Sequence, residues 1–187
     1  CNVNLLGEAV LGEREADKRF QQTLSLISDP DINYVSVKVS SVTSQINLWA
    51  FDHTLKRIEE RLRELYLHAA STSPPTFVNL DMEEYRDLEL TICAFMKLLD
   101  DPELRSIEAG IVLQAYLPDT FPALQRLTKW SNQRQRTGGG EIKTSLEEQK
   151  ELFTRLIKWL TSNGSYFPLL NIKHYNERFR GCLLYTS

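Results

Sequence analysis

The feature that most constrains this chain is a unit in which a short apolar strand pattern acquires a polar residue and leads into a helix pattern. The clearest strand pattern is 34–40, where three valines alternate with Ser36, Lys38 and Ser40. Strict alternation is the period of a β-strand. An amphipathic helix pattern follows at 51–70. Strands that alternate with helices indicate βα units and a parallel sheet.

Three further units follow the same plan. Val3–Ala9 precedes a helix pattern at 11–27, and Phe77–Asp81 precedes a second helix pattern. The fourth strand pattern, 110–119, leads into a helix for which Thr120 is the expected N-cap. Polar residues at the carboxyl ends of parallel strands are typical of the site-bearing edge of a barrel.

Two architectures fit this order of elements, a (β/α)8 barrel and a doubly wound open sheet. Polar residues on the strands themselves favour the barrel, because open α/β sheets bury both strand faces and carry ligands on their loops. A complete barrel has about 250 residues, and this chain has 187. We therefore expect an α/β fold that is a partial (β/α)8 TIM-like barrel of about four βα units.

Alternation also predicts which strand residues face the barrel interior. In a helix-covered barrel the valines of 34–40 face outward, so Lys38 faces inward with Ser36 and Ser40. A buried ammonium needs a counter-charge, and Asp81 on the next strand is the nearest candidate. Gln114 adds an amide from the fourth strand. The residues alone thus predict a polar site at the carboxyl ends of the strands.

Four motifs stand in the order and spacing of the proline dehydrogenase barrel. They are Asn4-Leu5-Leu6-Gly7-Glu8-Ala9, Val35-Ser36-Val37-Lys38-Val39-Ser40-Ser41, Phe77-Val78-Asn79-Leu80-Asp81-Met82-Glu83-Glu84 and Ile111-Val112-Leu113-Gln114-Ala115-Tyr116. The chain resembles this family over roughly residues 2–143. It is most similar to the bifunctional bacterial proline utilisation A proteins.

The resemblance implies a flavoenzyme that oxidises L-proline to pyrroline-5-carboxylate, with FAD as hydride acceptor and a membrane quinone as electron acceptor. It implies that Lys38 lies beside the flavin and binds the proline carboxylate, and that Asp81 pairs with Lys38. Gln114 would hydrogen-bond the flavin ring, with Tyr116 in the same wall. Glu8 would gate the pocket. The implied location is the cytoplasm, with peripheral association at the inner membrane face.

The sequence departs from the family after Lys143, where the family continues into a fifth strand whose arginine contacts the flavin. Here Ser145 and Glu148 match a capping box, and an amphipathic helix pattern extends to Leu160. We expect a helix in place of the fifth strand, and a domain that ends at residue 143. Residues 144–187 are interpreted as a divergent helix and tail, typical of a truncated or misassembled reading frame. The alternative function is a catalytically incompetent fragment or interaction module without a complete FAD site.

Composition narrows the function classes. A net charge of −3, with basic residues scattered through helix patterns, gives no electrostatic footprint for nucleic acid. Three widely spaced cysteines favour a reducing cytoplasm over a disulfide framework. No segment has the pattern of a membrane helix or signal peptide. The chain begins without Met in a strand pattern, which indicates a piece of a longer protein.

Simpler interpretations compete at several positions. Lys38 alone could be a solubilising edge-strand lysine, but the family resemblance favours the site. Glu83, Glu84 and Asp87 could hold a divalent metal, and solvated acids at a helix start are the favoured interpretation; no metal site is predicted. Packing is the expected role of the tryptophans at apolar helical positions: Trp49, Trp130 and Trp159.

Overall fold

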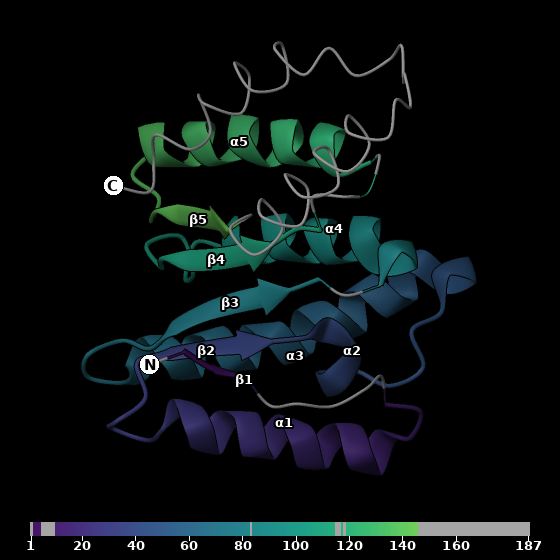
Figure 1. The fold of residues 1–187 in the computed structure, drawn as a ribbon. Coiled ribbons are helices and arrows are strands. Elements are labelled where there is room, and N and C mark those ends of the chain that lie inside the picture. The colour runs from purple at the N-terminus through teal and green to yellow at the C-terminus, as the bar shows by residue number, and fades with distance from the viewer. Residues whose placement is uncertain (1, 5–9, 83, 115–116, 118, 146–187) are drawn as a thin grey trace, which may run out of the picture. The chain divides into compact units, whose positions relative to one another are not determined.

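The computed structural model describes residues 2–4, 10–82, 84–114, 117 and 119–145. The chain divides into two compact units, Cys1–Gln149 and Lys150–Ser187, and every described residue lies in the first unit. Five parallel strands form its sheet (Figure 1): β1 Asn2–Asn4, β2 Tyr34–Val37, β3 Phe77–Asp81, β4 Ala109–Val112 and β5 Ile142–Ser145.

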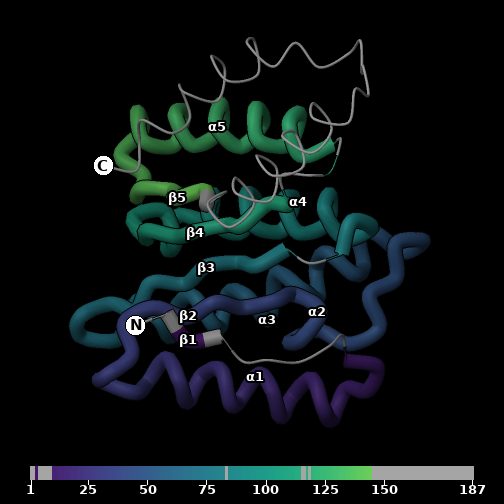
Figure 2. Tube along the Cα trace, in the orientation of Figure 1, coloured from purple at the N-terminus to yellow at the C-terminus, as the bar shows by residue number. Residues whose placement is uncertain are grey.

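Helices connect consecutive strands, and Figure 2 traces each crossover from one strand to the next. The longer ones are α1 Glu13–Ile27, α3 Phe51–Ser71, α4 Leu88–Leu99 and α5 Thr120–Arg136. The shorter ones are α2 Val39–Val42, η1 Leu48–Ala50 and η2 Tyr85–Asp87. Helix α3 packs against α1 and α4, and α4 packs against α5, so neighbouring helices follow neighbouring strands.

The strand order identifies the architecture. Each strand pairs in parallel with the next one in the sequence, in the order β1-β2-β3-β4-β5. A doubly wound sheet would reverse its order at a switch point, and no reversal occurs among these strands. Sequential order with helical crossovers is the plan of the (β/α)8 barrel. The prediction of a partial TIM-like barrel is confirmed.

The fifth strand corrects one expectation. Residues 142–145 form β5, which pairs with β4 in the register Ala109↔Ile142 to Val112↔Ser145. The expectation that a helix replaces this strand is therefore wrong for these residues. Ile142 and Thr144 are β-branched and suit pairing with β4. The capping-box pattern at Ser145 is compatible with this strand, because an N-cap residue is itself extended. The remainder of the predicted helix lies outside the described residues.

The second strand is shorter than its alternation predicts. β2 ends at Val37, and the next residues form the single turn α2. Both the backbone N–H and the hydroxyl of Ser41 donate to the Lys38 carbonyl, at 3.0 and 2.8 Å. Local bonds of this kind compete with strand pairing. The expectation that Ser40 faces the interior as a strand residue is wrong.

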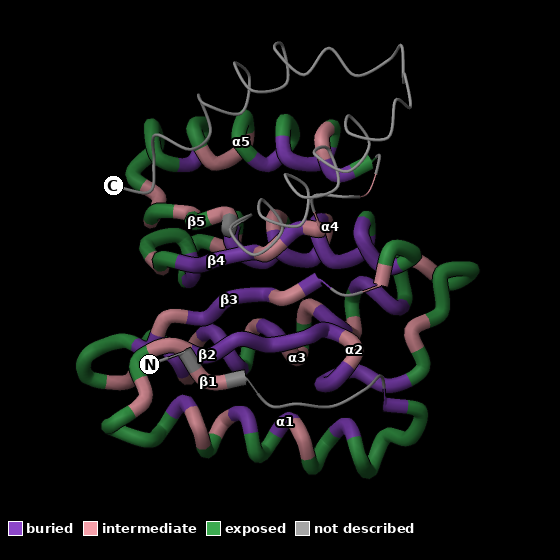
Figure 3. The backbone as a smooth tube through the Cα atoms, in the orientation of Figure 1, coloured by how far each residue is buried: buried purple, intermediate pink, exposed green. Residues whose placement is uncertain are grey.

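The core lies between the sheet and the helices. The outward residues of β3, Val78 and Leu80, are buried, and Ile111 of β4 is equally buried. The inward residues Phe77 and Val112 are only half-buried. Figure 3 shows buried segments along β2 to β4 and along parts of the helices. Asn79, on the same inner face of β3, is nevertheless buried at 3% exposure, so burial does not separate the two faces and the predicted alternation stays a prediction.

Gly110 has a packing role on the inner face of β4. It pairs with Asn79 across the β3–β4 ladder. A Cβ atom at Gly110 would lie 2.3 Å from the Asn79 Oδ1 atom and 3.0 Å from the Phe77 ring. Since no side chain fits in that space, glycine lets Asn79 and Phe77 fill the layer below Asp81.

Candidate active site

Lys38 is the first residue after β2, at the carboxyl end of the strand. Only 9% of the residue is exposed. The two bonds from Ser41 hold its backbone carbonyl, so the turn α2 fixes where the side chain begins. A largely buried ammonium in this position is a strong local charge, because electrostatic interactions strengthen as water is excluded.

Asp81 ends the neighbouring strand β3 and is half-buried. The last register pair of β2 and β3 is Val37↔Leu80, so Lys38 and Asp81 are the next residues on the two strands. Neighbouring strands lie about 4.8 Å apart. The pKa of the Tyr34 phenol is raised, first by burial and then by the charge of Asp81. The structure therefore brings the predicted cation and carboxylate to adjacent strand ends.

Gln114 lies two residues beyond β4 and is half-buried. Its backbone carbonyl accepts hydrogen bonds from the Leu117 N–H at 3.3 Å and from the Thr120 hydroxyl at 2.6 Å. Asp119 is the N-cap of α5, and Thr120 is its first residue. The helix therefore starts one residue earlier than predicted with Thr120 as the N-cap. The Thr120 hydroxyl holds Gln114 in place of capping the helix.

Three of the five predicted site residues thus lie at the carboxyl ends of successive strands. Glu8 and Tyr116 lie outside the described residues. An ammonium and an amide suit a flavin, whose ring carries carbonyl and nitrogen acceptors and one N–H donor. Lys38, Asp81 and Gln114 together fit one wall of a site for an anionic substrate and a flavin.

Asp87 is a buried acid that the sequence interpretation missed. It was expected to be a solvated acid at a helix start, and it is only 5% exposed. Burial raises the pKa of its carboxyl. The available signal is helical spacing, because Asp87 precedes Leu90 and Thr91 by three and four positions and both are buried. Within the described residues no group of three His, Cys, Asp or Glu side chains could hold a metal.

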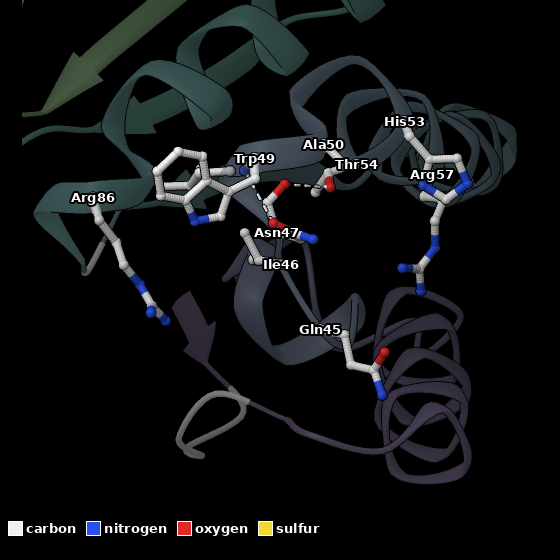
Figure 4. A pocket seen from close by; sticks show the side chains of 10 residues that line it. Gln45, Ile46, Asn47, Trp49, Ala50, His53, Thr54, Arg57 and Arg86 are labelled. Carbon is white, nitrogen blue, oxygen red and sulfur yellow. Dashed lines mark hydrogen bonds between the residues drawn. The ribbon is translucent and has the colours of Figure 1, made fainter.

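A cavity of about 480 Å³ lies beyond β2. Figure 4 shows Arg57 and His53 on one side of it, and Trp49 and Arg86 on the other. Lys38, Asp81 and Gln114 do not line this cavity.

The packing role predicted for three tryptophans is wrong for one, confirmed for another and untested for the third. Trp49 is 100% exposed, so the packing role expected for it is wrong. It belongs to the η1 turn, and the helix pattern from which that role was inferred begins only at Phe51. Trp130 packs edge-on against Phe95 at 5.9 Å, which confirms its packing role. Trp159 lies outside the described residues.

None of the described helices has the length and apolar character needed to cross a membrane.

Comparison with solved structures finds the same fold. Proline utilization A from Corynebacterium freiburgense is 52% identical, with a TM-score of 0.73, over 76% of this chain and 15% of that chain. The protein from Bdellovibrio bacteriovorus, solved after inactivation by N-propargylglycine, is 32% identical, with a TM-score of 0.68, over 76% of this chain and 17% of that chain. Proline utilization A from Bradyrhizobium japonicum shares the fold, with a TM-score of 0.67 at 19% identity. The match covers 76% of this chain and 15% of that chain.

The chain spans about 15% of the length of the first of these relatives. No curated protein sequence matches the chain. The model of the proline dehydrogenase family matches residues 1–142, which contain every strand motif of the candidate site. With sequential parallel strands and polar residues at their carboxyl ends, this match shows that the chain belongs to the proline dehydrogenase family.

Proposed function

We propose that this domain forms part of a barrel that oxidises L-proline to pyrroline-5-carboxylate with FAD as cofactor. The observation that carries the proposal is the placement of Lys38, Asp81 and Gln114 at the ends of three successive strands in a member of the proline dehydrogenase family. The relative inactivated by N-propargylglycine, a modified amino acid, supports an amino acid as substrate.

Lys38 is proposed to bind the substrate carboxylate. Its ammonium is largely buried, so the ion pair forms with little screening by water. Before substrate binds, Asp81 pairs with the Lys38 ammonium, because an unpaired buried ammonium is costly. Asp81 also forms the wall beside it. Lys38 then orients the proline ring and does not act as a base, since positioning supplies much of the rate in such reactions.

Gln114 is proposed to bind the flavin ring through its amide. FAD, when bound, supplies the acceptor for the hydride that leaves the proline ring. Thr120 contributes by holding the Gln114 backbone, so the amide starts from a fixed position. Glu8 is proposed to gate the pocket, and Tyr116 is proposed to lie in the wall beside the flavin. The proposed final electron acceptor is a quinone, with peripheral association of the complete protein at the inner membrane face.

The test is a chimera that carries residues 1–142 of this chain in place of the matching segment of the Corynebacterium freiburgense relative, which is 52% identical. The rate at which L-proline bleaches the flavin absorbance is measured without oxygen. Lys38→Ala and Asp81→Ala should each slow bleaching roughly 30-fold or more, because removing one partner of a buried charge pair costs about 2–5 kcal/mol. The exposed Lys56 supplies the control, Lys56→Ala.

The second candidate is that this polypeptide by itself is a catalytically incompetent fragment or interaction module. The observation that favours it is β5, which carries Thr144 and Ser145 where the family resemblance leads to an arginine beside the flavin. We expect the purified 187-residue chain to bind FAD poorly and to show no proline:quinone activity. A yellow protein whose flavin spectrum bleaches with proline would overturn this candidate.

A further inference from the structure

Two segments lead from the candidate site into the helices. Residues 82–87 lie between β3 and α4, and residues 113–119 lie between β4 and α5. Figure 1 shows the arrows of β3 and β4 ending at the same edge of the sheet. Among the described residues, the last backbone bond at this end of β3 and β4 runs from the Met82 N–H to the Val112 carbonyl at 3.4 Å. Beyond it, strand pairing no longer fixes where the two segments lie.

Among the described residues, a side-chain bond joins the segments beyond that point. The Tyr85 hydroxyl donates a hydrogen bond to Oδ2 of Asp119, 34 positions later in the chain. A phenol that donates to a carboxylate makes a charge-assisted bond, stronger than a neutral one. The bond to Asp119 raises the pKa of the Tyr85 phenol, as expected when the neutral donor is favoured.

Each partner is tied to a predicted site residue. Asp119 directly precedes Thr120, whose hydroxyl holds the Gln114 carbonyl at 2.6 Å. Tyr85 opens the turn η2, which is separated from Asp81 only by residues 82–84. Met82 is 3% exposed, so this short connection is anchored in the core. The bond between Tyr85 and Asp119 therefore closes a path from Asp81 to Gln114.

We propose that Tyr85 and Asp119 are a positioning pair that sets the spacing of Asp81 and Gln114. About half of Tyr85 is exposed, so water competes for the bond and its contribution to global stability is small. Its effect falls on the two segments, which lie beyond the last register pair of β3 and β4, Asp81↔Val112. The inference rests on the proposed function only for the identity of the ligands, proline and FAD, that Asp81 and Gln114 are proposed to hold.

The test uses the full chain with Tyr85→Phe, Asp119→Ala and the double variant. The matched control is Asp100→Ala, because Asp100 accepts a bond from the Trp130 indole N–H at 2.9 Å and so joins the end of α4 to α5 through another aromatic donor. The first readout is nuclear magnetic resonance of the Gln114 side-chain amide and the Asp81 carboxyl carbon. Thermal unfolding is measured in parallel.

We expect both signals to move in Tyr85→Phe and Asp119→Ala, and to move no further in the double variant, as for partners in one interaction. The melting temperature should change little, and Asp100→Ala should leave both signals in place. Signals that stay unmoved in Tyr85→Phe would overturn the proposal. So would a Tyr85 phenol whose ultraviolet titration is the same in the unsubstituted chain and in Asp119→Ala.

The second readout is FAD titration followed by quenching of flavin fluorescence. The affinity of the two single variants should be roughly 2- to 10-fold weaker than that of the unsubstituted chain, as for loss of one hydrogen bond. If the unsubstituted chain does not bind FAD, the result contradicts the proposed function for this polypeptide alone. The positioning role of Tyr85 and Asp119 is then decided by the resonances of Gln114 and Asp81.

Discussion

At the scale of single residues, a side chain's place could be predicted wherever a strand fixes its direction. Asp81 follows from the alternation of Phe77–Asp81. Lys38 was predicted from the alternation of 34–40, although the strand ends at Val37 and Lys38 lies directly after it. Asp87 could not be placed in this way, because its burial depends on how η2 packs. Acidic residues at a helix start are expected to be exposed to solvent, and the sequence does not show which of them the tertiary fold buries.

Asp87 gives a prediction on pH dependence. Burial raises its folded-state pKa above the unfolded value, which is about 3.9. The carboxyl therefore contributes stability that is fully present below the unfolded pKa and is lost as the pH rises through the folded pKa. In Asp87→Asn this loss should disappear, so the variant should be more stable than the unsubstituted chain at neutral pH and should lose that advantage below about pH 4.

The measurement is the urea midpoint across that pH range. Asparagine is as good an N-cap as aspartate, so the substitution leaves the helix start unchanged. Asp31→Asn, at an exposed position, serves as the control. An Asp87→Asn variant that is less stable than the unsubstituted chain at every pH would contradict the assigned burial penalty.

At the scale of elements, helices and strands with strong periodicity could be predicted well. The patterns at 11–27 and 51–70 became α1 and α3 with ends shifted by at most two residues, and Phe77–Asp81 became β3 without change. The weak points were positions where a local signal competes with pairing. The bonds from Ser41 end β2 early. Residues 142–145 pair with β4, where a helix was expected to replace the strand.

Arg134 connects one element to a distant loop and was not predicted. It lies in the last turn of α5, where an arginine is normally solvated, and it is only 4% exposed. Its guanidinium donates to the carbonyls of Leu99, Leu104, Arg105 and Ile107. Burial lowers the pKa of this guanidinium. These partners are the last residue of α4 and three residues of the segment between α4 and β4. No local sequence pattern in α5 predicts contacts so distant in the chain.

Arg134→Met should therefore destabilise the domain by about 3 kcal/mol or more, because buried carbonyls would lose a charged donor. Methionine keeps much of the apolar stem, which limits the change in packing. The measurement is the free energy of unfolding from urea titration. Arg136→Met, at an exposed position in the same turn, should stay within about 0.5 kcal/mol of the unsubstituted chain; equal effects of the two substitutions would contradict the role of Arg134.

At the scale of the whole molecule, the architecture could be predicted because it follows from the repeat of units. Four strand-then-helix patterns with polar strand ends predict sequential parallel strands, and the sheet has that order. The number of strands could not be predicted, since β5 is only Ile142–Ser145 and depends on β4 for its pairing. The domain boundary after residue 143 stays a prediction.

The central claim is that Lys38, Asp81 and Gln114 form one wall of a proline and flavin site. The most direct measurement is the anaerobic bleaching of flavin absorbance by L-proline in the chimera that carries residues 1–142. We predict a yellow chimera that bleaches with proline, and bleaching that slows roughly 30-fold or more in Lys38→Ala and Asp81→Ala but not in Lys56→Ala. A chimera that bleaches equally fast with all three substitutions would contradict the claim.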